Sequence, residues 1–346
     1  MYKFTLNILS AAIALSIVAG ADAKDKELNI YSARHYQTDD ALYGEFTKKT
    51  GIKINRIEAD DNALLERLKT EGMNSPADII LMVDAARLWR AQIEGLFQPV
   101  KSKVLAARIP AHLQGNDAGQ GPQWYGFSTR ARVIVYNKAT VKPEDVATYE
   151  ALAEPKNKGK VCTRSGSHPY MLSLIGSLVE RDGQKATEDW ARGMVSNFAR
   201  PPRGGDTDQI NGVASGECGV TLANTYYYVR MMRSTKPEDI QAMSKIDFVW
   251  PNQKTSGAHM NVAGGGVARH APHREAAVQF LEYLAGDSAQ RNFSDGNNEW
   301  PVVPTAKTHN PTLESLGKFK AEKRSIATIG KNQIVAQKIL DRAGYK

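Results

Sequence analysis

The chain has 346 residues, of which 42% are hydrophobic and 24% are charged, and its formal net charge is +8 at pH 7. Its lysines and arginines alternate with aspartates and glutamates and form no basic block, which argues against a nucleic-acid-binding surface. A chain of this length exceeds the size at which a single hydrophobic core usually stops growing, so we expect two lobes.

Residues 1–23 have the pattern of an export signal. Lys3 lies in a short basic start, an apolar stretch follows from Phe4 to Val18, and Ala21-Asp22-Ala23 offers the small residues of a cleavage site. The apolar stretch is shorter than the about 20 residues that a membrane-spanning helix needs. We therefore expect cleavage after Ala23 and a periplasmic protein that does not insert into the membrane.

The first half of the remaining chain alternates predicted strands and helices. Strands are expected at residues 28–31, 52–57 and 77–83, and helices at residues 38–50, 60–72 and 84–94. Leu42 and Phe46 stand four residues apart, on what would be the buried face of the first helix. Such alternation predicts an α/β fold whose ligands bind beyond the carboxyl ends of the strands. His35 and Tyr36 follow the first strand and so fall at this edge.

Later segments are expected to connect the two lobes. The apolar run Val133–Tyr136 predicts a connecting strand within residues 127–137, and a second crossing is expected at residues 262–267. Gly264-Gly265-Gly266 lacks the spacing of a phosphate-binding loop and indicates a hinge or a tightly packed backbone. Residues 318–346 alternate lysines with apolar residues, as an amphipathic helix does.

The densest group of phenols is the run Thr225-Tyr226-Tyr227-Tyr228. A tyrosine run is more often packing than a metal site, because tyrosine is an ordinary core and interface residue. At a helix start, however, neighbouring side chains diverge by roughly 100° and can converge on one ion. Asn224 or Thr225 is a suitable N-cap, which would place Tyr226 and Tyr227 in the first turn with Arg230 nearby.

Two further tyrosines suggest what the run could bind. Tyr36 follows His35, and Tyr170 ends the turn-rich stretch 165–170. A phenol, with an ordinary pKa of about 10, binds metal as the phenolate, and a small trivalent cation lowers that pKa. Tyrosinate is a ligand of iron, whereas softer metals recruit thiolates and imidazoles. The chain contains no CxxC, HExxH or EF-hand motif, so Fe(III) is the metal ion that we expect the tyrosines to bind, with Fe(II) left open.

Cys162 and Cys218 are the only cysteines. An even cysteine count in an exported chain favours one disulfide between them, and the alternative is two unpaired buried thiols. A catalytic cysteine is disfavoured, because neither residue has an evident general base nearby in the sequence.

Five sequence marks together resemble one family. They are Tyr31-Ser32-Ala33-Arg34-His35-Tyr36, Ser75-Pro76-Ala77-Asp78, residues 128–137, Asn224-Thr225-Tyr226-Tyr227 and Glu299-Trp300-Pro301-Val302. Over essentially the whole mature chain, the sequence resembles the tyrosine-rich branch of the periplasmic ferric-ion-binding proteins. The resemblance implies a type II periplasmic-binding-protein fold: two lobes, each a mixed, mostly parallel sheet flanked by helices, joined by hinge strands. We expect an N-terminal lobe from residues 24–127 and 262–300, and a C-terminal lobe from 128–261 and 301–346.

The resemblance also implies a ligand set. Tyr226 and Tyr227 match the family's iron-binding pair, Tyr170 matches a third tyrosine, and His35 and Tyr36 match the ligand position of the first lobe. Four phenolates around a trivalent ion would leave one net negative charge, which Arg230 is expected to compensate. Better-known members carry a carboxylate where this chain has Val83, and Asp84 is one residue away.

The function implied by the resemblance is capture of iron by lobe closure and its delivery to an ABC-type permease and ATPase. The protein would be a monomer and not an enzyme, with carbonate or a similar anion left open as an additional ligand. One alternative is a type II binding protein for an organic or oxyanion ligand, in which the tyrosines stack or donate hydrogen bonds. A secreted iron-dependent oxidase is disfavoured, because the sequence offers no evident acid and base pair.

Overall fold

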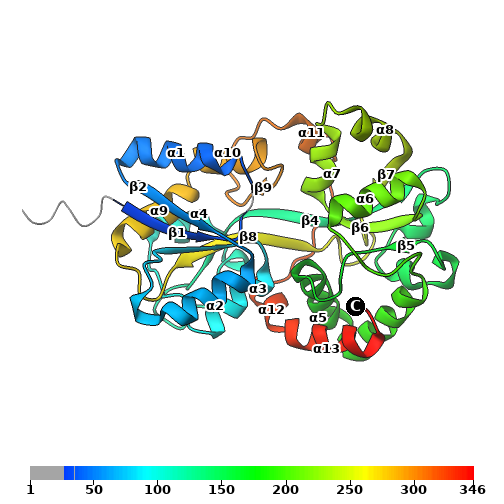
Figure 1. Ribbon diagram of the computed structural model, residues 1–346, viewed down its shortest axis with the longest axis horizontal. Coiled ribbons are helices and arrows are strands. Elements are labelled where there is room, and N and C mark those ends of the chain that lie inside the picture. The colour runs from blue at the N-terminus through cyan, green and yellow to red at the C-terminus, as the bar shows by residue number, and fades with distance from the viewer. Residues whose placement is uncertain (1–26, 35) are drawn as a thin grey trace, which may run out of the picture.

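The computed structural model describes residues 27–34 and 36–346. The expected export signal, its cleavage site after Ala23 and His35 lie outside these residues. Figure 1 shows two halves joined in the middle by long strands, as the sequence predicted. Among the described residues, no helix is long and apolar enough to cross a membrane.

The first half is built on three parallel strands in the order β2-β1-β3, with β8 antiparallel to β3. The strands are β1 (Glu27–Ser32), β2 (Lys53–Glu58), β3 (Ile79–Met82) and β8 (Met260–Val267). Its helices are α1 (Asp39–Thr50), α2 (Asp61–Glu71), α3 (Ala85–Ile93), α4 (Lys103–Arg108), α9 (Arg274–Leu284) and α10 (Asp287–Asp295). Predicted helix ends hold here: Gly51 ends α1 in the left-handed conformation, and the Asp60 side chain caps α2.

The second half contains β4 (Tyr125–Asn137), β5 (Val161–Cys162), β6 (Val220–Asn224) and β7 (Ile246–Val249). Its helices are α5 (Pro169–Ser196), α6 (Asp206–Ser215), α7 (Thr225–Met232), α8 (Pro237–Lys245) and α11 (Pro311–Glu314). The short strand β9 (Trp300–Pro301) pairs with β4.

Short 3₁₀ helices occur in both halves. They lie at Gly72–Asn74, Ala111–Leu113, Pro143–Val146, Glu150–Ala153 and Pro155–Asn157.

The predicted crossing strands are β4 and β8. The first part of β4 pairs with β8, and its second part pairs with β6 and β7, so β4 runs through both halves. Every pairing of β4 with another described strand is antiparallel, and the parallel pairs among the described strands are β1 with its two neighbours and β5 with β6. The sheets are mixed as expected, with more antiparallel pairing than the alternation of elements indicated. The three glycines of β8 are packing positions, because a side chain on Gly265 would begin 2.5 Å from the Ile80 carbonyl oxygen.

The C-terminal segment differs from the single helix expected over residues 318–346. It forms α12 (Ile326–Lys331) and α13 (Gln333–Ala343), which meet at Asn332. The residues before α12 are not helical, because Ala321 bridges to Ala258. The Asn332 side chain donates a hydrogen bond to the Gly176 carbonyl oxygen of α5, which fixes the break between the two helices.

Buried side chains form one cluster in the first half and two in the second. The first cluster also contains Val302, Val303, Ile326 and Ile329. These residues belong to the segment 301–346, which the sequence assigned to the C-terminal lobe. The chain therefore packs against both halves after β9, and the lobe boundaries stay a proposal.

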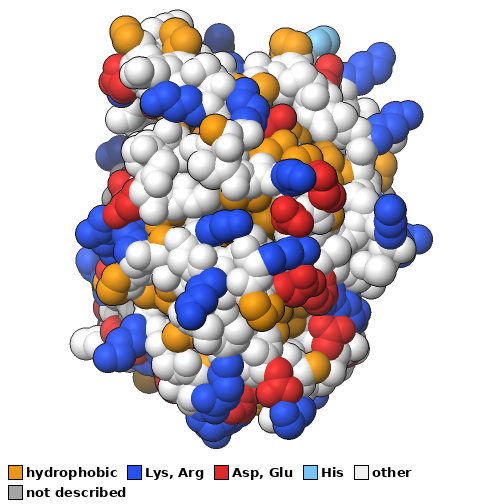
Figure 2. Space-filling model, turned by 90° about the vertical axis from the view of Figure 1, so that its right-hand side faces the viewer, with side chains coloured by type: hydrophobic (Ala, Val, Ile, Leu, Met, Phe, Trp, Pro, Cys, Tyr) orange, Lys and Arg blue, Asp and Glu red, His pale blue; other side chains and the backbone are white. Residues whose placement is uncertain are grey.

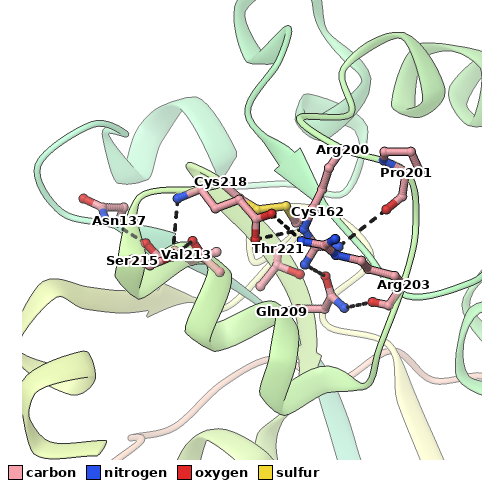
Figure 3. The surroundings of a disulfide bond; sticks show 12 residues. Asn137, Cys162, Arg200, Pro201, Arg203, Gln209, Val213, Ser215, Cys218 and Thr221 are labelled. Carbon is pink, nitrogen blue, oxygen red and sulfur yellow. Dashed lines mark hydrogen bonds and ion pairs between the residues drawn. A yellow bond between two sulfur atoms is a disulfide. The ribbon is translucent and has the colours of Figure 1, made fainter. Parts of the chain in front are cut away.

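Cys162 and Cys218 form a disulfide, as the cysteine count predicted. Figure 3 shows the bond between β5 and the loop after α6, with Arg200 and Gln209 nearby. The two Cα atoms are 5.7 Å apart and both residues are buried. The bond joins residues separated by 56 positions, so it restricts a long stretch of the unfolded chain.

Replacing both cysteines with alanine is expected to lower the free energy of unfolding by about 4 kcal/mol, because the unfolded chain regains the entropy of the open loop. Equilibrium urea unfolding of the purified protein measures this change. The matched control is the wild-type protein unfolded with a thiol reductant, which should approach the variant. An unfolding midpoint unchanged by the substitutions would contradict a stabilising role for the bond.

Candidate metal centre

The tyrosines singled out by the sequence lie at the ends of three different elements. Tyr36 lies between β1 and α1, Tyr170 is in the first turn of α5, and Tyr226 and Tyr227 are in the first turn of α7. The predicted helix start at Asn224 is confirmed, although its side chain does not cap the helix. Its amide oxygen instead accepts a hydrogen bond from Arg132.

The structure brings these four tyrosines together. The hydroxyl oxygens of Tyr170 and Tyr226 are 3.0 Å apart and share a hydrogen bond. The ring of Tyr36 meets the ring of Tyr226 edge-on with centroids 5.7 Å apart, and the rings of Tyr226 and Tyr227 are 4.2 Å apart. Tyr170 and Tyr226 are almost fully buried. Phenols from both halves of the molecule therefore form one tyrosine cluster.

Burial sets the protonation state of these phenols. Burial raises the pKa of Tyr226 well above its ordinary value, and the neighbouring Tyr170 and Tyr36 raise it further. The pKa of Tyr170 is also raised, first by burial and then by Tyr227. Burial and the carboxylate of Glu299 raise the pKa of Tyr36 in the same way. Without a cation these three phenols are neutral at physiological pH, so a metal that binds them must displace protons.

Arg130 and Glu299 also lie beside these phenols. The residue patterns in the sequence did not identify either of them as a site residue. The Arg130 side chain is 1% exposed, and none of its nitrogens has a hydrogen-bond partner among the described residues. Its guanidinium lies 5.5 Å from the ring centroid of Tyr170 and 3.9 Å from a carboxylate oxygen of Glu299. Glu299 accepts hydrogen bonds from Ser128 and from the Tyr36 hydroxyl, at 2.7 and 3.3 Å. Arg130 is thus a buried cation that lacks a full set of partners and lies beside a group of phenols. Such a cation suits a site that becomes more negative when the phenols lose their protons.

A cluster of buried charged side chains lies against the ring of Tyr170. The guanidinium groups of Arg164 and Arg132 lie 4.8 and 5.9 Å from its ring centroid. Both arginines bind Asp206, at 3.0 and 2.7 Å, and Asp206 also accepts the backbone N–H of Asn224. Burial by itself would raise the pKa of Asp206, but the two arginines outweigh it and lower that pKa. This cluster ties the start of α7 to the strand and loop that flank Tyr170.

His168 caps the helix that carries Tyr170. Its Nδ1 accepts the backbone N–H of Tyr170 at 3.2 Å. Burial and the nearby Arg164 lower the pKa of His168 to about 3, so the ring is neutral at physiological pH. A neutral ring is needed here, because only an unprotonated Nδ1 can accept this hydrogen bond.

Arg230 lies at the surface against one of the phenols. Its guanidinium is 5.0 Å from the ring centroid of Tyr227, and it donates a hydrogen bond to Thr207. The expected contact with the tyrosine run therefore exists, but Arg230 is exposed. The buried cations within 4.8 to 5.9 Å of a phenol ring centroid include Arg34, Arg130, Arg132 and Arg164.

Asp84 is occupied elsewhere. Its carboxylate accepts hydrogen bonds from the Ala86 backbone, the Ser173 hydroxyl and the Asn261 amide, at 2.6 to 2.7 Å. Asp84 thus caps α3 and contacts α5, and Val83 has no ligating atom in its side chain. Among the described residues, the His, Cys, Asp and Glu side chains that cluster closely enough to share an ion are Cys162, Glu217 and Cys218, and both cysteines are used in the disulfide.

Known proteins similar to this chain combine the same fold with iron. The bacterial extracellular solute-binding protein family matches residues 41–321. Iron uptake protein A1 of Synechocystis sp. is 47% identical over 329 residues, which cover 95% of this chain and 90% of that protein. A structure of Trichodesmium FutA in complex with iron and citrate ligands has a TM-score of 0.86 at 49% identity, covering 92% of this chain and 100% of that one. The ferric binding protein from Campylobacter jejuni has a TM-score of 0.87 at 36% identity, with the same two coverages.

These similarities confirm the two-lobed type II fold that the sequence marks implied. The relatives are named for iron uptake or iron binding, and none of the three is named as an enzyme. This agrees with the expectation that the chain is a binding protein without catalytic activity.

Proposed function

This chain belongs to the bacterial extracellular solute-binding proteins, and we propose that it captures ferric iron between its lobes in the periplasm for an ABC-type importer. The single observation that carries the proposal is the meeting of the Tyr170 and Tyr226 hydroxyls, 3.0 Å apart and buried, beside Tyr36 and Tyr227. When these phenols lose their protons, they offer several hard anionic oxygens close together, which suit a small trivalent cation. The names of the relatives support iron as that cation.

The proposed ligands are the phenolates of Tyr36, Tyr170, Tyr226 and Tyr227. His35 lies outside the described residues and stays a proposed fifth ligand. Tyr36 belongs to the N-terminal lobe and the other three tyrosines to the C-terminal lobe, so an ion that binds all four links the lobes. Binding would then stabilise the closed state and present one surface to the permease and its ATPase, which we propose as partners of a monomer.

The charge of the loaded site can be balanced within the protein. Four phenolates and one ferric ion carry one net negative charge, and Arg130 is buried close enough to offset it. Arg230, against the outer ring of Tyr227, is proposed as a second, weaker compensating charge because it is exposed. The citrate present with the Trichodesmium relative supports an exogenous oxygen ligand here, of which carbonate is another example. Three phenolates with an imidazole could also hold ferrous iron.

Iron affinity is expected to fall as the pH is lowered. The buried phenols have raised pKa values and are protonated in the metal-free protein, so loading releases protons and acid favours the unloaded state. We expect the apparent affinity to drop by more than about tenfold per pH unit between pH 7.5 and 5.5, since more than one proton is released. Competition against a chelator, corrected for the chelator's own protonation, measures this slope.

The same titration tests the function itself. Tight binding of iron with release of several protons would support tyrosinate ligation. Binding that does not change with pH would contradict phenolate ligands. A protein that retains no iron at any pH would instead favour an organic or oxyanion ligand.

A further inference from the structure

The residues that follow α13 lie against the loop that carries Tyr170. Figure 1 shows α13 beside α5, the helix whose first turn contains Tyr170. Gly344 ends α13 in the left-handed conformation, with a φ of 74°. Tyr345 then enters the core and is 1% exposed. The sequence patterns did not identify Tyr345 or Lys346 as site residues, yet both contact the segment between β5 and α5.

The Tyr345 hydroxyl is bound to the start of this loop. It donates a hydrogen bond to the Thr163 hydroxyl at 2.7 Å, across 182 positions of the sequence, and both side chains are buried. Thr163 in turn donates to the Arg164 carbonyl oxygen at 3.3 Å or to the sulfur of Met171 at 3.9 Å. Arg164 lies against the ring of Tyr170, and Met171 is the next residue of α5. Through Thr163, the Tyr345 hydroxyl therefore reaches the chain on both sides of Tyr170.

The backbone makes a second contact at Gly166. Its N–H donates a hydrogen bond to the Lys346 carbonyl oxygen at 3.0 Å. This approach leaves no room for a side chain, because a Cβ on Gly166 would lie 2.6 Å from the Tyr345 carbonyl oxygen. That oxygen belongs to the main chain and cannot rotate away as a side chain could. Gly166 is thus needed for the close approach of the two segments.

The loop has little regular structure of its own. β5 has only two residues, and residues 163–168 between β5 and α5 belong to no helix or strand. A segment without regular hydrogen bonds opens locally at little cost unless other contacts hold it. The ring of Tyr345 packs edge-on against Phe198, with centroids 4.9 Å apart, and Phe198 bridges to Val161 of β5. Tyr345 therefore holds both β5 and the loop that follows it.

We propose that Tyr345 is a positioning residue of the iron site: its hydroxyl holds the loop so that the Tyr170 phenol meets that of Tyr226. This inference rests on the iron-binding function proposed above. Among the described residues, no hydrogen bond or ring contact joins Tyr345 to a proposed ligand, so it acts through Thr163 and the loop. Groups that hold a metal ligand in place affect metal affinity almost as much as ligands do.

Tyr345→Phe tests the proposal, because it removes the hydroxyl and keeps the ring that packs against Phe198. We expect the affinity for ferric iron, measured in competition with citrate, to fall about tenfold. In a Tyr170→Phe background, the same substitution should change the affinity by less than about twofold, because the residue through which it acts no longer binds the metal. A general loss of stability would lower the affinity equally in both backgrounds.

Gly166→Ala tests the same loop in a different way. The added Cβ would force the loop away from the Tyr345 backbone, so we expect the affinity to fall at least about tenfold. The matched controls are Gly44→Ala, whose Cβ would meet no atom within 4 Å, and Tyr125→Phe. Tyr125→Phe removes another buried tyrosine hydroxyl, which donates to the Val100 carbonyl oxygen in the core of the first half. Both controls should keep the wild-type affinity within about twofold, and circular dichroism verifies that each variant is folded.

Wild-type affinity in Tyr345→Phe would overturn the proposal, whatever the effect of Gly166→Ala, and would leave the iron-binding function in place. An equal loss of affinity with and without the Tyr170 hydroxyl would show that Tyr345 does not act on this ligand. A loss as large in Tyr125→Phe would assign the effect to the removal of any buried hydroxyl. Wild-type protein that binds no iron would instead overturn the function on which the proposal rests.

Discussion

The Tyr226→Phe, Tyr227→Phe double variant is expected to bind ferric iron at least about a thousandfold more weakly than the wild type. The reason is that the variant lacks two of the four proposed phenolate ligands, whereas the loss of a group that only supports a ligand already costs 10- to 100-fold. The fold should survive, because phenylalanine keeps the rings that pack 4.2 Å apart. Chelator competition measures the affinity, and circular dichroism verifies the fold.

The same run of tyrosines provides the control. Tyr228 follows the pair in α7, but its ring lies against Phe248, with centroids 5.2 Å apart, within a buried cluster that Tyr227 contacts only from its edge as a partly buried residue. Tyr228→Phe should therefore leave iron affinity unchanged within about threefold, as expected for a phenol that is not one of the proposed ligands. Ligation by Tyr226 and Tyr227 is contradicted if Tyr228→Phe weakens binding as strongly as the double variant, or if the double variant binds normally.

Asp206→Asn is expected to lower the free energy of unfolding by about 4 kcal/mol, because it leaves two buried arginines without their charge partner. Asp206 is fully buried and holds Arg132, Arg164 and the backbone of Asn224 together. Asp208→Asn is the matched control: Asp208 is two residues further along α6 and exposed. It should cost less than about 1 kcal/mol. Urea unfolding at neutral pH compares the two variants.

The destabilisation by Asp206→Asn should also depend on pH. The pKa of Asp206 is lowered in the folded protein, so its contribution to stability is present above the ordinary carboxyl pKa of about 3.9 and is lost as the pH falls through the folded value. The difference between wild type and variant should therefore shrink in acid below about pH 4. A difference that stays constant down to pH 2 would show that the carboxylate charge is not responsible.

The sequence predicted those features that depend on local patterns. Leu42 and Phe46 marked the buried face of α1, and Asp60 marked the start of α2, because periodicity and capping act within a few residues. The tyrosine pair was placed correctly in the first turn of α7 for the same reason. The C-terminal segment was predicted incorrectly as one helix, since its break depends on a contact between Asn332 and the distant Gly176.

The charged surroundings of the tyrosines could not be predicted from the residues alone. Arg130 and Arg132 alternate along β4, which normally indicates a solvent-exposed face, yet both are 1% exposed. They are buried because α5 brings Tyr170 over their guanidinium groups. Glu299 reaches Tyr36 across 263 positions of the sequence. The residues lie within segments that resemble the iron-binding family, but only the fold reveals which charges meet the phenols.

The face of the molecule that Figure 2 shows agrees with the absence of a basic block in the sequence. On the face that Figure 2 shows, lysines and arginines are mixed with aspartates and glutamates and form no continuous basic stripe. An unbroken basic surface would have supported nucleic acid as a partner. The positive groups that matter for the proposed function are instead the buried Arg130 and Arg230, which lies against the ring of Tyr227.

The most direct measurement is a visible absorption spectrum of the purified mature protein during titration with ferric citrate. Ferric phenolate absorbs visible light, whereas protonated tyrosine does not. Tyrosinate ligation predicts a broad visible band that saturates at one iron per chain and is absent from the Tyr226→Phe, Tyr227→Phe variant. A wild-type protein that adds no such band to the absorption of ferric citrate itself would contradict tyrosinate ligation of iron.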